Sequence, residues 1–384
     1  MNKTVFKLLL LISILSLSIT CSHKIKYSYS PIPPISSLDS LTYHYHPENV
    51  RLPLQNHTLT TSLVAVGDIM IGEHVTDFLD KYGHSYPFDS TKHIIQAVPF
   101  AIGNLEAPFS KTGVRFDKKY TFKIDPRYAD GLVEAGFDVL NLANNHMMDY
   151  GHGALINTLS TLDSLNLYYS GAGINKQEAM KPAFVTQNNI TIAFIGCSMT
   201  YPVEFWAKKD SAGTFYPYEK DLKNQIQSAQ EKAEFVVVSF HWGQELRDTP
   251  KEYQRHFAHL SIDNGADLVL GHHPHILQGI EVYNDKLIVY SLGNFAFGSY
   301  SGKAKDSIIF KIHFAQNGFY FAKIIPISVL NHEVKFQPKI VKGNRQHSII
   351  THLNTISFSL NRNRNIIDEN GYIWGNWTDK YFRK

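Results

Sequence analysis

Seven short apolar runs, each ending in a polar or glycine-containing tip, constrain the fold more than any other feature of this sequence. Most of them are rich in β-branched residues, as central strands covered on both faces should be. From residue 59 onward they read LTTSLVAVGD, AVPFAIGNLE, FDVLNLANNH, ITIAFIGCS, AEFVVVSFHWG, ADLVLGHHPH and KLIVYSLGNF.

Segments with helical composition separate several of these runs. They are residues 126–136, 152–166, 218–233 and 250–265. Strands that alternate with helices predict an α/β domain whose sheet is largely parallel. Residues 307–329 predict two further strands, with the Asn317-Gly318 pair as the hairpin turn between them.

Composition limits the class of partner. The 384 residues allow one large α/β domain, and 18% of them are charged, with a formal charge of +3. No block of basic residues stands out, so we do not expect nucleic acid to be the partner. The 19 histidines matter more, because neutral imidazole is the commonest metal ligand in proteins.

The N-terminus has the features of an export signal. Lys3 and Lys7 precede the apolar run Leu8–Ile19, which is too short for a comfortable membrane span, and Cys21 follows directly. Residues 1–21 therefore predict a lipoprotein-type signal peptide, with acylated Cys21 as a lipid anchor that holds an exported protein to a membrane of the cell envelope. A plain secretory signal remains the alternative, since Thr20 is larger than the usual residue before such a cysteine.

The rest of the chain divides by composition. Residues 22–58 are rich in Ser, Pro, Tyr and His and predict a flexible tether. Residues 59–335 hold the strand and helix pattern of the main domain. Residues 336–384 are more polar, and we expect them to form a C-terminal tail that packs on that domain.

Side chains able to bind a metal stand where the apolar runs stop. The crevice of an open α/β sheet lies at the carboxyl ends of its strands, so residues distant in sequence converge there. The candidate ligands are Asp68, Glu106, Asn145, His241, His273 and His275. Singly, each has an ordinary explanation: Asp68 could cap a helix, and His241 could be a hydrogen-bonded core histidine. Together they suit one or two divalent ions such as Mn²⁺, Fe²⁺ or Zn²⁺, with Glu106 able to bridge a pair.

The GHHPH stretch and its surroundings suggest further roles. Side-chain alternation predicts that His273 and His275 point the same way, while His272 faces the other side and supports the site indirectly. Asp149 lies three residues after His146 and could orient that imidazole. The other residues expected to support the ligands are Asn104, Asn144, Trp242 and Asn294.

The order of these motifs carries a family resemblance. The succession VGDIMIG, GNLEAPFS, GFDVLNLANNHMMDYG, FHWGQEL, GADLVLGHHPHILQGIEVY and YSLGNFAFG resembles the poly-gamma-glutamate capsule biosynthesis protein CapA family, which is related to the calcineurin-like metallophosphoesterases. The resemblance runs from about Leu63 to Gly298. It implies an α/β fold of four layers, an α/β/β/α sandwich, with a two-metal cleft.

The resemblance also assigns roles within the cleft. Asp68 matches the first-motif aspartate, and Met70 stands where that motif has a histidine, so one ligand of the first metal is absent. The other roles that it implies are a bridging carboxylate for Glu106, an amide ligand for Asn145, a general acid for His146, a lone histidine ligand for His241 and a closing histidine pair for His273 and His275.

The resemblance implies an exported metal-dependent hydrolase acting in the biosynthesis of poly-gamma-glutamate or another capsule polymer. The hydrolysed bond could be at phosphorus or at an acyl carbon. In either case we expect His146 to act as general acid, aided by Asp149, and Glu106 to hold the metal. The expected partner is an anionic extracellular polymer or its synthase complex. Two alternatives remain, a non-catalytic envelope module that binds the polymer or synthase, and an extracytoplasmic phosphatase or phosphodiesterase.

Overall fold

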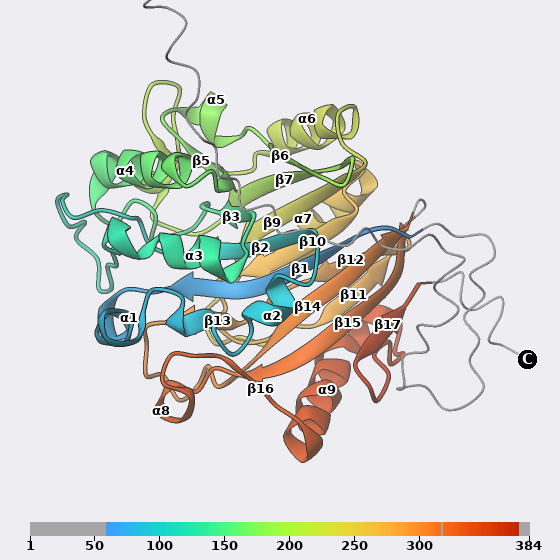
Figure 1. Cartoon of the computed structure of the whole chain (residues 1–384). Helices are drawn as coiled ribbons and strands as arrows, with labels where there is room; N and C mark the ends of the chain where they lie inside the picture. Colours follow the sequence, from blue (N-terminus) through green and yellow to red (C-terminus); the bar gives the residue numbers. More distant parts are fainter. Residues whose placement is uncertain (1–58, 316–317, 376–384) are drawn as a thin grey trace, which may run out of the picture. The chain divides into compact units, whose positions relative to one another are not determined.

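Two β-sheets form the centre of this protein in a computed structural model that describes residues 59–315 and 318–375 (Figure 1). The predicted signal peptide with Cys21, the tether at 22–58 and Asn317 of the hairpin turn lie outside the described residues. Among the residues described, no helix is long and apolar enough to cross a membrane.

The first sheet has nine strands within the described residues, and its centre is parallel. Strands β1 to β4 run parallel to one another, whereas β14 and β15 form an antiparallel pair beside β1. The predicted strand pair of residues 307–329 is therefore present. The strands are β1 (Leu59–Met70), β2 (Phe100–Leu105), β3 (Val139–Asn141), β4 (Tyr168–Ser170), β13 (Asn294–Phe297), β14 (Asp306–Ala315), β15 (Gly318–Ser328), β16 (Lys339–Ile340) and β17 (Tyr372–Trp374).

The second sheet has six strands in the same part of the chain, in the order β11-β12-β10-β9-β7-β6. Its four central strands are parallel, and an antiparallel strand closes each edge. They are β6 (Ala183–Gln187), β7 (Ile190–Ser198), β9 (Phe235–His241), β10 (Leu268–His272), β11 (Ile280–Tyr283) and β12 (Lys286–Val289). A small pair, β5 (Ala172–Gly173) and β8 (Gly213–Thr214), lies apart from both sheets.

Helices α3, α4, α6 and α7 correspond to the four segments predicted to be helical. In α4, Leu155, Leu159 and Leu162 repeat at helical spacing and are buried, while the exposed positions other than Ile156 are mostly polar. Gly136 ends α3 in the left-handed conformation, with a φ of 95° and its N–H bonded to the Leu132 carbonyl. The helices are α1 (Thr76–Tyr82), α2 (Lys92–Ile95), α3 (Asp130–Ala135), α4 (Gly151–Ser164), α5 (Lys176–Ala179), α6 (Glu219–Gln230), α7 (Glu252–Asp263), α8 (Asn331–Val334) and α9 (Gly343–Ser357).

A buried apolar layer joins the two sheets. Leu63 and Phe310 of the first sheet pack in one cluster with Val237 and Leu270 of the second, and all four are fully buried. At about 25 cal/mol per Å² of apolar surface, this layer is a main source of the stability that holds the sheets together.

Helices cover the outer face of each sheet. Leu79 of α1 and Leu132 of α3 belong to the apolar cluster outside the first sheet, and Leu222 of α6 and Ala258 of α7 belong to the cluster outside the second. Figure 1 shows α1 to α3 in front of the first sheet and α6 and α7 beyond the second. The prediction of a four-layer α/β/β/α sandwich is confirmed.

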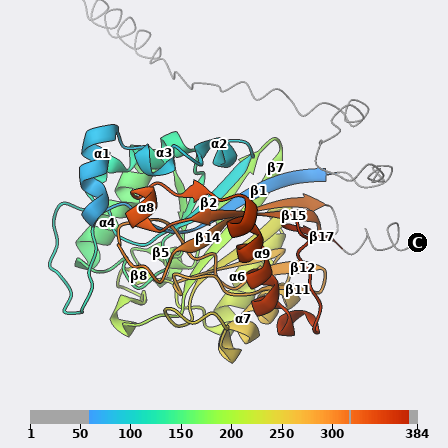
Figure 2. The same cartoon turned by 90° about the horizontal axis from the view of Figure 1, so that it is seen from below.

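Part of the segment predicted as a tail is built into the sandwich. Helix α9 contacts both β11 and β15, and Ile349 and Leu353 from it join the layer between the sheets. Strand β17 adds to the first sheet by pairing with β15 (Figure 2).

Candidate metal centre

Strand register brings the polar tips of the first sheet together. Asp68 on β1 pairs in register with Asn294 on β13 and with Asn104 on β2. In the second sheet, His272 on β10 pairs with His241 on β9. Because these strands are parallel, their carboxyl ends lie at one edge, where the residues predicted as ligands meet.

Two glycines allow the strands to approach closely beneath the cluster. A Cβ on Gly67 would lie 1.9 Å from the Gly293 carbonyl oxygen, so no larger residue fits there without a shift of the backbone. The Asp68 N–H donates to that same carbonyl at 3.0 Å. Gly67 therefore allows β1 and β13 to approach closely at the residue before Asp68.

Glu106 occupies the middle of the cluster. It belongs to two groups of possible metal-binding atoms in which every pair lies within 4.8 Å, one with His273 and His275 and the other with Asp68 and His241. Its Oε1 atom lies 3.4 Å from Nε2 of His241 and 3.9 Å from Nε2 of His275. Glu106 is the one residue common to both groups.

Several buried atoms of the cluster lack hydrogen-bond partners. Both carboxylate oxygens of Glu106, both ring nitrogens of His272 and Nδ1 of His273 are buried without one. An unsatisfied buried polar group costs about 1–3 kcal/mol, so such atoms in one place indicate a missing ligand. Carboxylate and imidazole donors suit a borderline divalent cation, and the residues present therefore fit one.

The charges of the cluster are strongly coupled. Burial raises the pKa of Asp68, but the nearby rings of His272 and His275 outweigh it and hold that pKa well below its usual value. Burial and the neighbouring Asp68 raise the pKa of Glu106 well above its usual value. Burial opposes protonation of His275, yet Glu106 and Asp68 raise its pKa to about 10.

Two other histidines of the cluster, His241 and His273, are held neutral. Burial lowers the pKa of His273 to about 3, and the charge of His275 acts in the same direction. Burial and then His273 lower the pKa of His241 well below its usual value. Neutral imidazole is the form that binds a metal.

The prediction that His272 faces away from the cluster is wrong. Its Nδ1 lies 3.3 Å from Oδ1 of Asp68, and the ring is almost completely buried. The φ angles of 94° at His273 and 59° at His275 explain the error, because side-chain alternation holds only in extended backbone. His272 shares the inner face of its sheet with His241, its register partner.

Three asparagines brace the cluster. Asn104 donates through Nδ2 to Oδ1 of Asp68 at 2.9 Å, and Asn144 donates to the Leu105 carbonyl at 2.8 Å. Oδ1 of Asn294 lies 2.9 Å from Nδ1 of His275. Asn104 thus positions the Asp68 carboxylate, and Asn294 positions the His275 ring. Asn144 ties its own loop to the end of β2.

The loop after β3 supplies Asn145. Its Oδ1 lies 2.7 Å from Nε2 of His241, so the predicted amide ligand reaches the same ring as Glu106. Trp242 lies elsewhere: it is fully buried outside the second sheet, stacks on Phe240 at 4.3 Å and donates to the Tyr290 carbonyl.

His146, Asp149 and Lys118 form a second polar group beside the cluster. Nδ1 of His146 lies 2.7 Å from Oδ2 of Asp149, and the Lys118 ammonium pairs with the other Asp149 oxygen at 2.5 Å. Lys118 also donates to the Asn145 carbonyl. Burial lowers the pKa of both His146 and Lys118, and Asp149 opposes both shifts.

Sequence analysis missed Lys118. Its signal is weak, a pair of lysines in the loop FDKKYTFK between two motifs. Met70, which stands where the resembled pattern has a histidine, is fully buried in the outer apolar cluster. It offers no ligand atom to the centre.

The fold and this site define a class, the α/β/β/α sandwich proteins with a buried carboxylate and imidazole cluster at the sheet edge. Residues 62–299, more than half of the chain, match the model of a family described as "Bacterial capsule synthesis protein PGA_cap". The chain belongs to this family, and the prediction made from its motifs is confirmed.

Curated relatives agree with that assignment. The chain is 32% identical over 305 residues to the capsule biosynthesis protein CapA of Bacillus anthracis, covering 77% of this chain and 74% of that protein. It is 35% identical over 291 residues to the PGA biosynthesis protein CapA of Bacillus subtilis (strain 168), covering 75% and 76%. A protein of Mycobacterium tuberculosis (strain ATCC 25618 / H37Rv), named as a probable polyglutamine synthesis accessory protein, is 28% identical over half of this chain.

Solved structures show more distant likeness. A 5'-nucleotidase precursor from Thermus thermophilus has a TM-score of 0.43 at 12% identity, covering 73% of this chain and 54% of its own. The calcineurin-like phosphoesterase YfkN from Bacillus subtilis has a TM-score of 0.42 at 12% identity, covering 77% and 96%. The chain spans about half the length of that nucleotidase.

Proposed function

We propose that this chain is an exported, lipid-anchored, metal-dependent hydrolase that acts in the biosynthesis of poly-gamma-glutamate or a related capsule polymer. The names printed for the two Bacillus relatives support the biological role. The sequence pattern of residues 1–21 supports export and the anchor at Cys21.

The single observation that carries the hydrolase proposal is the position of Glu106. It is fully buried, has no hydrogen-bond partner on either oxygen and takes part in both possible metal-binding groups. A buried carboxylate in this state is stabilised when cations bind it. Asp68 and His241 would complete one position, and His273 and His275 the other.

A divalent metal held here would supply Lewis-acid activation of water and of the bond to be cleaved. The remaining work falls to side chains of this chain. Asp149 accepts from Nδ1 of His146, which fixes the ring, and its charge favours the doubly protonated ring, which can give its Nε2 proton to a leaving group. Lys118 holds Asp149 from its other side and places a positive charge beside the centre.

A second candidate is a non-catalytic accessory module that binds the polymer or its synthase. Met70 favours it, because the buried thioether stands where the resembled pattern has a metal-binding histidine. The printed name of the mycobacterial relative, an accessory protein, also favours it.

Metal content and turnover distinguish the two candidates. The full chain and a His273→Ala, His275→Ala double variant are analysed by elemental mass spectrometry, then assayed on a generic phosphodiester and on poly-gamma-glutamate. The hydrolase proposal expects bound transition metal and turnover of one substrate, both lost in the double variant.

Metal in the wild-type chain without turnover of either substrate would favour the accessory module. Full activity in a metal-free double variant would remove the mechanism altogether. Mass analysis of the mature N-terminus tests export separately, because an acylated Cys21 and an unprocessed Met1 differ in mass.

A further inference from the structure

A basic loop lies directly beside the candidate centre. Residues 111–123 leave the body of the protein after Ser110 and return at Ile124, where the Ser110 N–H donates to the Ile124 carbonyl at 2.9 Å. Lys111, Arg115, Lys118, Lys119 and Lys123 stand in this loop against one acid, Asp117. Loops of this kind, closed at the base, are often functional.

The loop is held in place by the second polar group of the site. The Phe116 N–H donates to the Asp149 carbonyl at 2.8 Å, and the Phe122 N–H donates to the Asp149 carboxylate at 2.7 Å. The Phe122 ring lies 4.4 Å from the ring of His146. The backbone of the loop is thus held at the edge of the centre.

Most of those charges are not used within the protein. Lys118 pairs with Asp149, and Lys111 has only a long contact of 3.7 Å with Asp125. Within the described residues, the other three cations have no carboxylate partner. They contact neutral groups: Arg115 donates to Thr121 and to a backbone carbonyl, Lys119 lies over Tyr120, and Lys123 donates to a carbonyl and lies over Tyr150.

An aromatic pocket continues from the loop. Phe205 packs against Phe116 at 4.9 Å, and Lys118 lies 5.1 Å over the Phe205 ring. The residue after Phe205, Trp206, lines a pocket of about 310 Å³.

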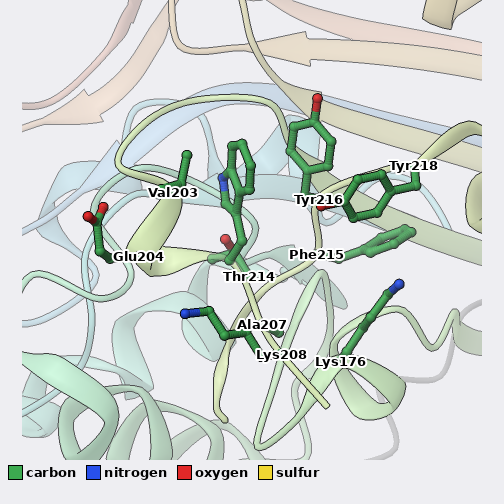
Figure 3. A pocket seen from close by; sticks show the side chains of 10 residues that line it. Lys176, Val203, Glu204, Ala207, Lys208, Thr214, Phe215, Tyr216 and Tyr218 are labelled. Atoms are coloured by element: carbon green, nitrogen blue, oxygen red, sulfur yellow. The ribbon is translucent and has the colours of Figure 1, made fainter. Parts of the chain in front are cut away.

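The pocket combines rings with cations, and Glu204 is the one acid among its lining residues. Trp206 and Tyr216 lie 4.0 Å apart, and Tyr216 and Tyr218 lie 4.9 Å apart. Figure 3 shows Tyr216 and Tyr218 on one side and Lys176 and Lys208 on the other. Lys208 is exposed and has no ion-pair partner among the described residues, whereas Lys176 pairs with Asp221.

We propose that the 111–123 loop and the Trp206 pocket together bind one extended polycarboxylate strand and lead it to the centre at Glu106 and His146. A poly-gamma-glutamate strand carries one free α-carboxylate per residue, and two methylene groups of each residue lie in its backbone. Arg115, Lys119 and Lys208 would pair with the carboxylates, and the rings would cover the methylene groups. Lys118 is the cation nearest to the centre. The inference rests on the proposed function for the chemistry of the polymer.

An anionic membrane is the rival occupant. Val114 and Tyr120 are 85% and 58% exposed, and a basic loop with apolar tips can bind lipid headgroups. The polymer fits better because the surface continues from Lys118, which faces into the site, to a concave pocket. A flat bilayer would meet only the outermost side chains.

Binding by the full chain tests the inference. Poly-gamma-glutamate of defined length, free glutamate and vesicles of phosphatidylglycerol and phosphatidylcholine are the three probes. An Arg115→Ala, Lys119→Ala variant should bind the polymer about tenfold more weakly, because it removes two exposed cations that would each pair with a carboxylate. Tyr218→Ala, at an exposed ring of the pocket, should weaken binding about threefold.

A Lys232→Ala, Lys339→Ala variant removes the same charge from exposed lysines outside this surface and should bind as the wild type does. Wild-type affinity in the Arg115→Ala, Lys119→Ala variant would overturn the inference. If the two substitutions abolished binding to the vesicles and left polymer binding unchanged, the inference would be overturned and the membrane would be the occupant.

Metal content and turnover of a small phosphodiester separate this inference from the proposed function. Turnover is measured on the wild-type chain, and metal content should not change in the Arg115→Ala, Lys119→Ala variant, because neither residue belongs to the groups that could hold a metal. Polymer binding through the loop in a chain without turnover would support the inference while the hydrolase proposal failed. Turnover without polymer binding would support the hydrolase proposal and overturn this inference.

Discussion

Nδ1 of His146 lies 2.7 Å from Oδ2 of Asp149, and the Lys118 ammonium holds the other oxygen of that carboxylate. The three side chains come from two loops that follow β2 and β3. Neither His146 nor Asp149 belongs to the groups of atoms that could hold a metal. The site therefore has two separable parts. One is a cluster that can bind cations, and the other is His146, whose ring is oriented by Asp149.

Asp149→Asn tests that separation. Oδ2 of Asp149 accepts from the imidazole, and the carboxylate charge favours the protonated ring that a general acid needs; an amide at this position lacks that charge. The kcat on the hydrolysed substrate should fall about 100-fold, the lower limit for loss of general acid catalysis. Metal content should stay at the wild-type value, and exposed Asp77→Asn should change neither quantity. A parallel loss of metal would mean that Asp149 supports the cluster itself.

Glu106→Gln should change stability in opposite directions with and without metal. In a chelator, the substitution removes a buried carboxylate without partners, and the free energy of unfolding should rise by about 1–3 kcal/mol. With added Mn²⁺ or Zn²⁺ the wild-type chain should gain stability by mass action, and the variant should gain less. Thermal unfolding at pH 8 with and without metal measures both effects.

Glu281→Gln provides a matched control for that experiment. Glu281 is also a buried carboxylate, but it accepts from the Tyr290 hydroxyl at 2.7 Å and lies 3.1 Å from Nε2 of His259. The same substitution there should lower stability, whether or not metal is present. Equal losses of stability in the two variants would contradict the assignment of Glu106 as a cation-binding residue.

The strand tips could be predicted from sequence because the pattern of a buried parallel sheet is local. Each apolar run ends at a polar residue, and parallel strands collect such ends at one edge. Asp68, Glu106 and His241 converge for this reason. The four-layer sandwich followed from the family resemblance, and the two helix-covered sheets confirm it.

What could not be predicted depends on loop geometry. Lys118 reaches the site because its loop folds back on Asp149, a contact between residues far apart in sequence. His272 was misplaced because His273 and His275 adopt positive φ angles, which no periodicity reveals. The strand pairing of β17 was also hidden, since Tyr372–Trp374 is too short to give an alternating pattern.

Asp138 should make stability depend on pH. Burial raises the pKa of this carboxyl to about 7, from an ordinary value of 3.8. The folded state thus binds a proton that the unfolded state releases, so this residue should lower stability as pH rises from about 4 to 7. Asp138→Asn keeps an acceptor for the Ala101 N–H and should stabilise the chain by about 1–3 kcal/mol at pH 8.

Urea unfolding of the wild type and of Asp138→Asn at pH 5 and pH 8 measures that effect. The advantage of the variant should shrink at pH 5, where the wild-type carboxyl is protonated. An advantage that stayed constant between the two pH values would mean that packing or hydrogen bonding, and not ionisation, accounts for it.

Gly67→Ala should damage the fold and the metal centre together. Its new methyl group would lie 1.9 Å from the Gly293 carbonyl oxygen, the acceptor for the Asp68 N–H. Strands β1 and β13 would have to separate, which should cost about 2–3 kcal/mol of stability and lower metal content by moving Asp68. Urea unfolding and elemental analysis measure the two effects.

Gly153→Ala is the matched control, because the same methyl group meets nothing within 4 Å on helix α4. Alanine favours helix over glycine, so this variant should gain about 0.5–1 kcal/mol and keep its metal. If Gly67→Ala lost stability but bound metal normally, the close approach of β1 and β13 would serve packing alone. Loss of metal in a variant that unfolds only slightly earlier than wild type would instead show that this approach sets the position of the Asp68 carboxylate.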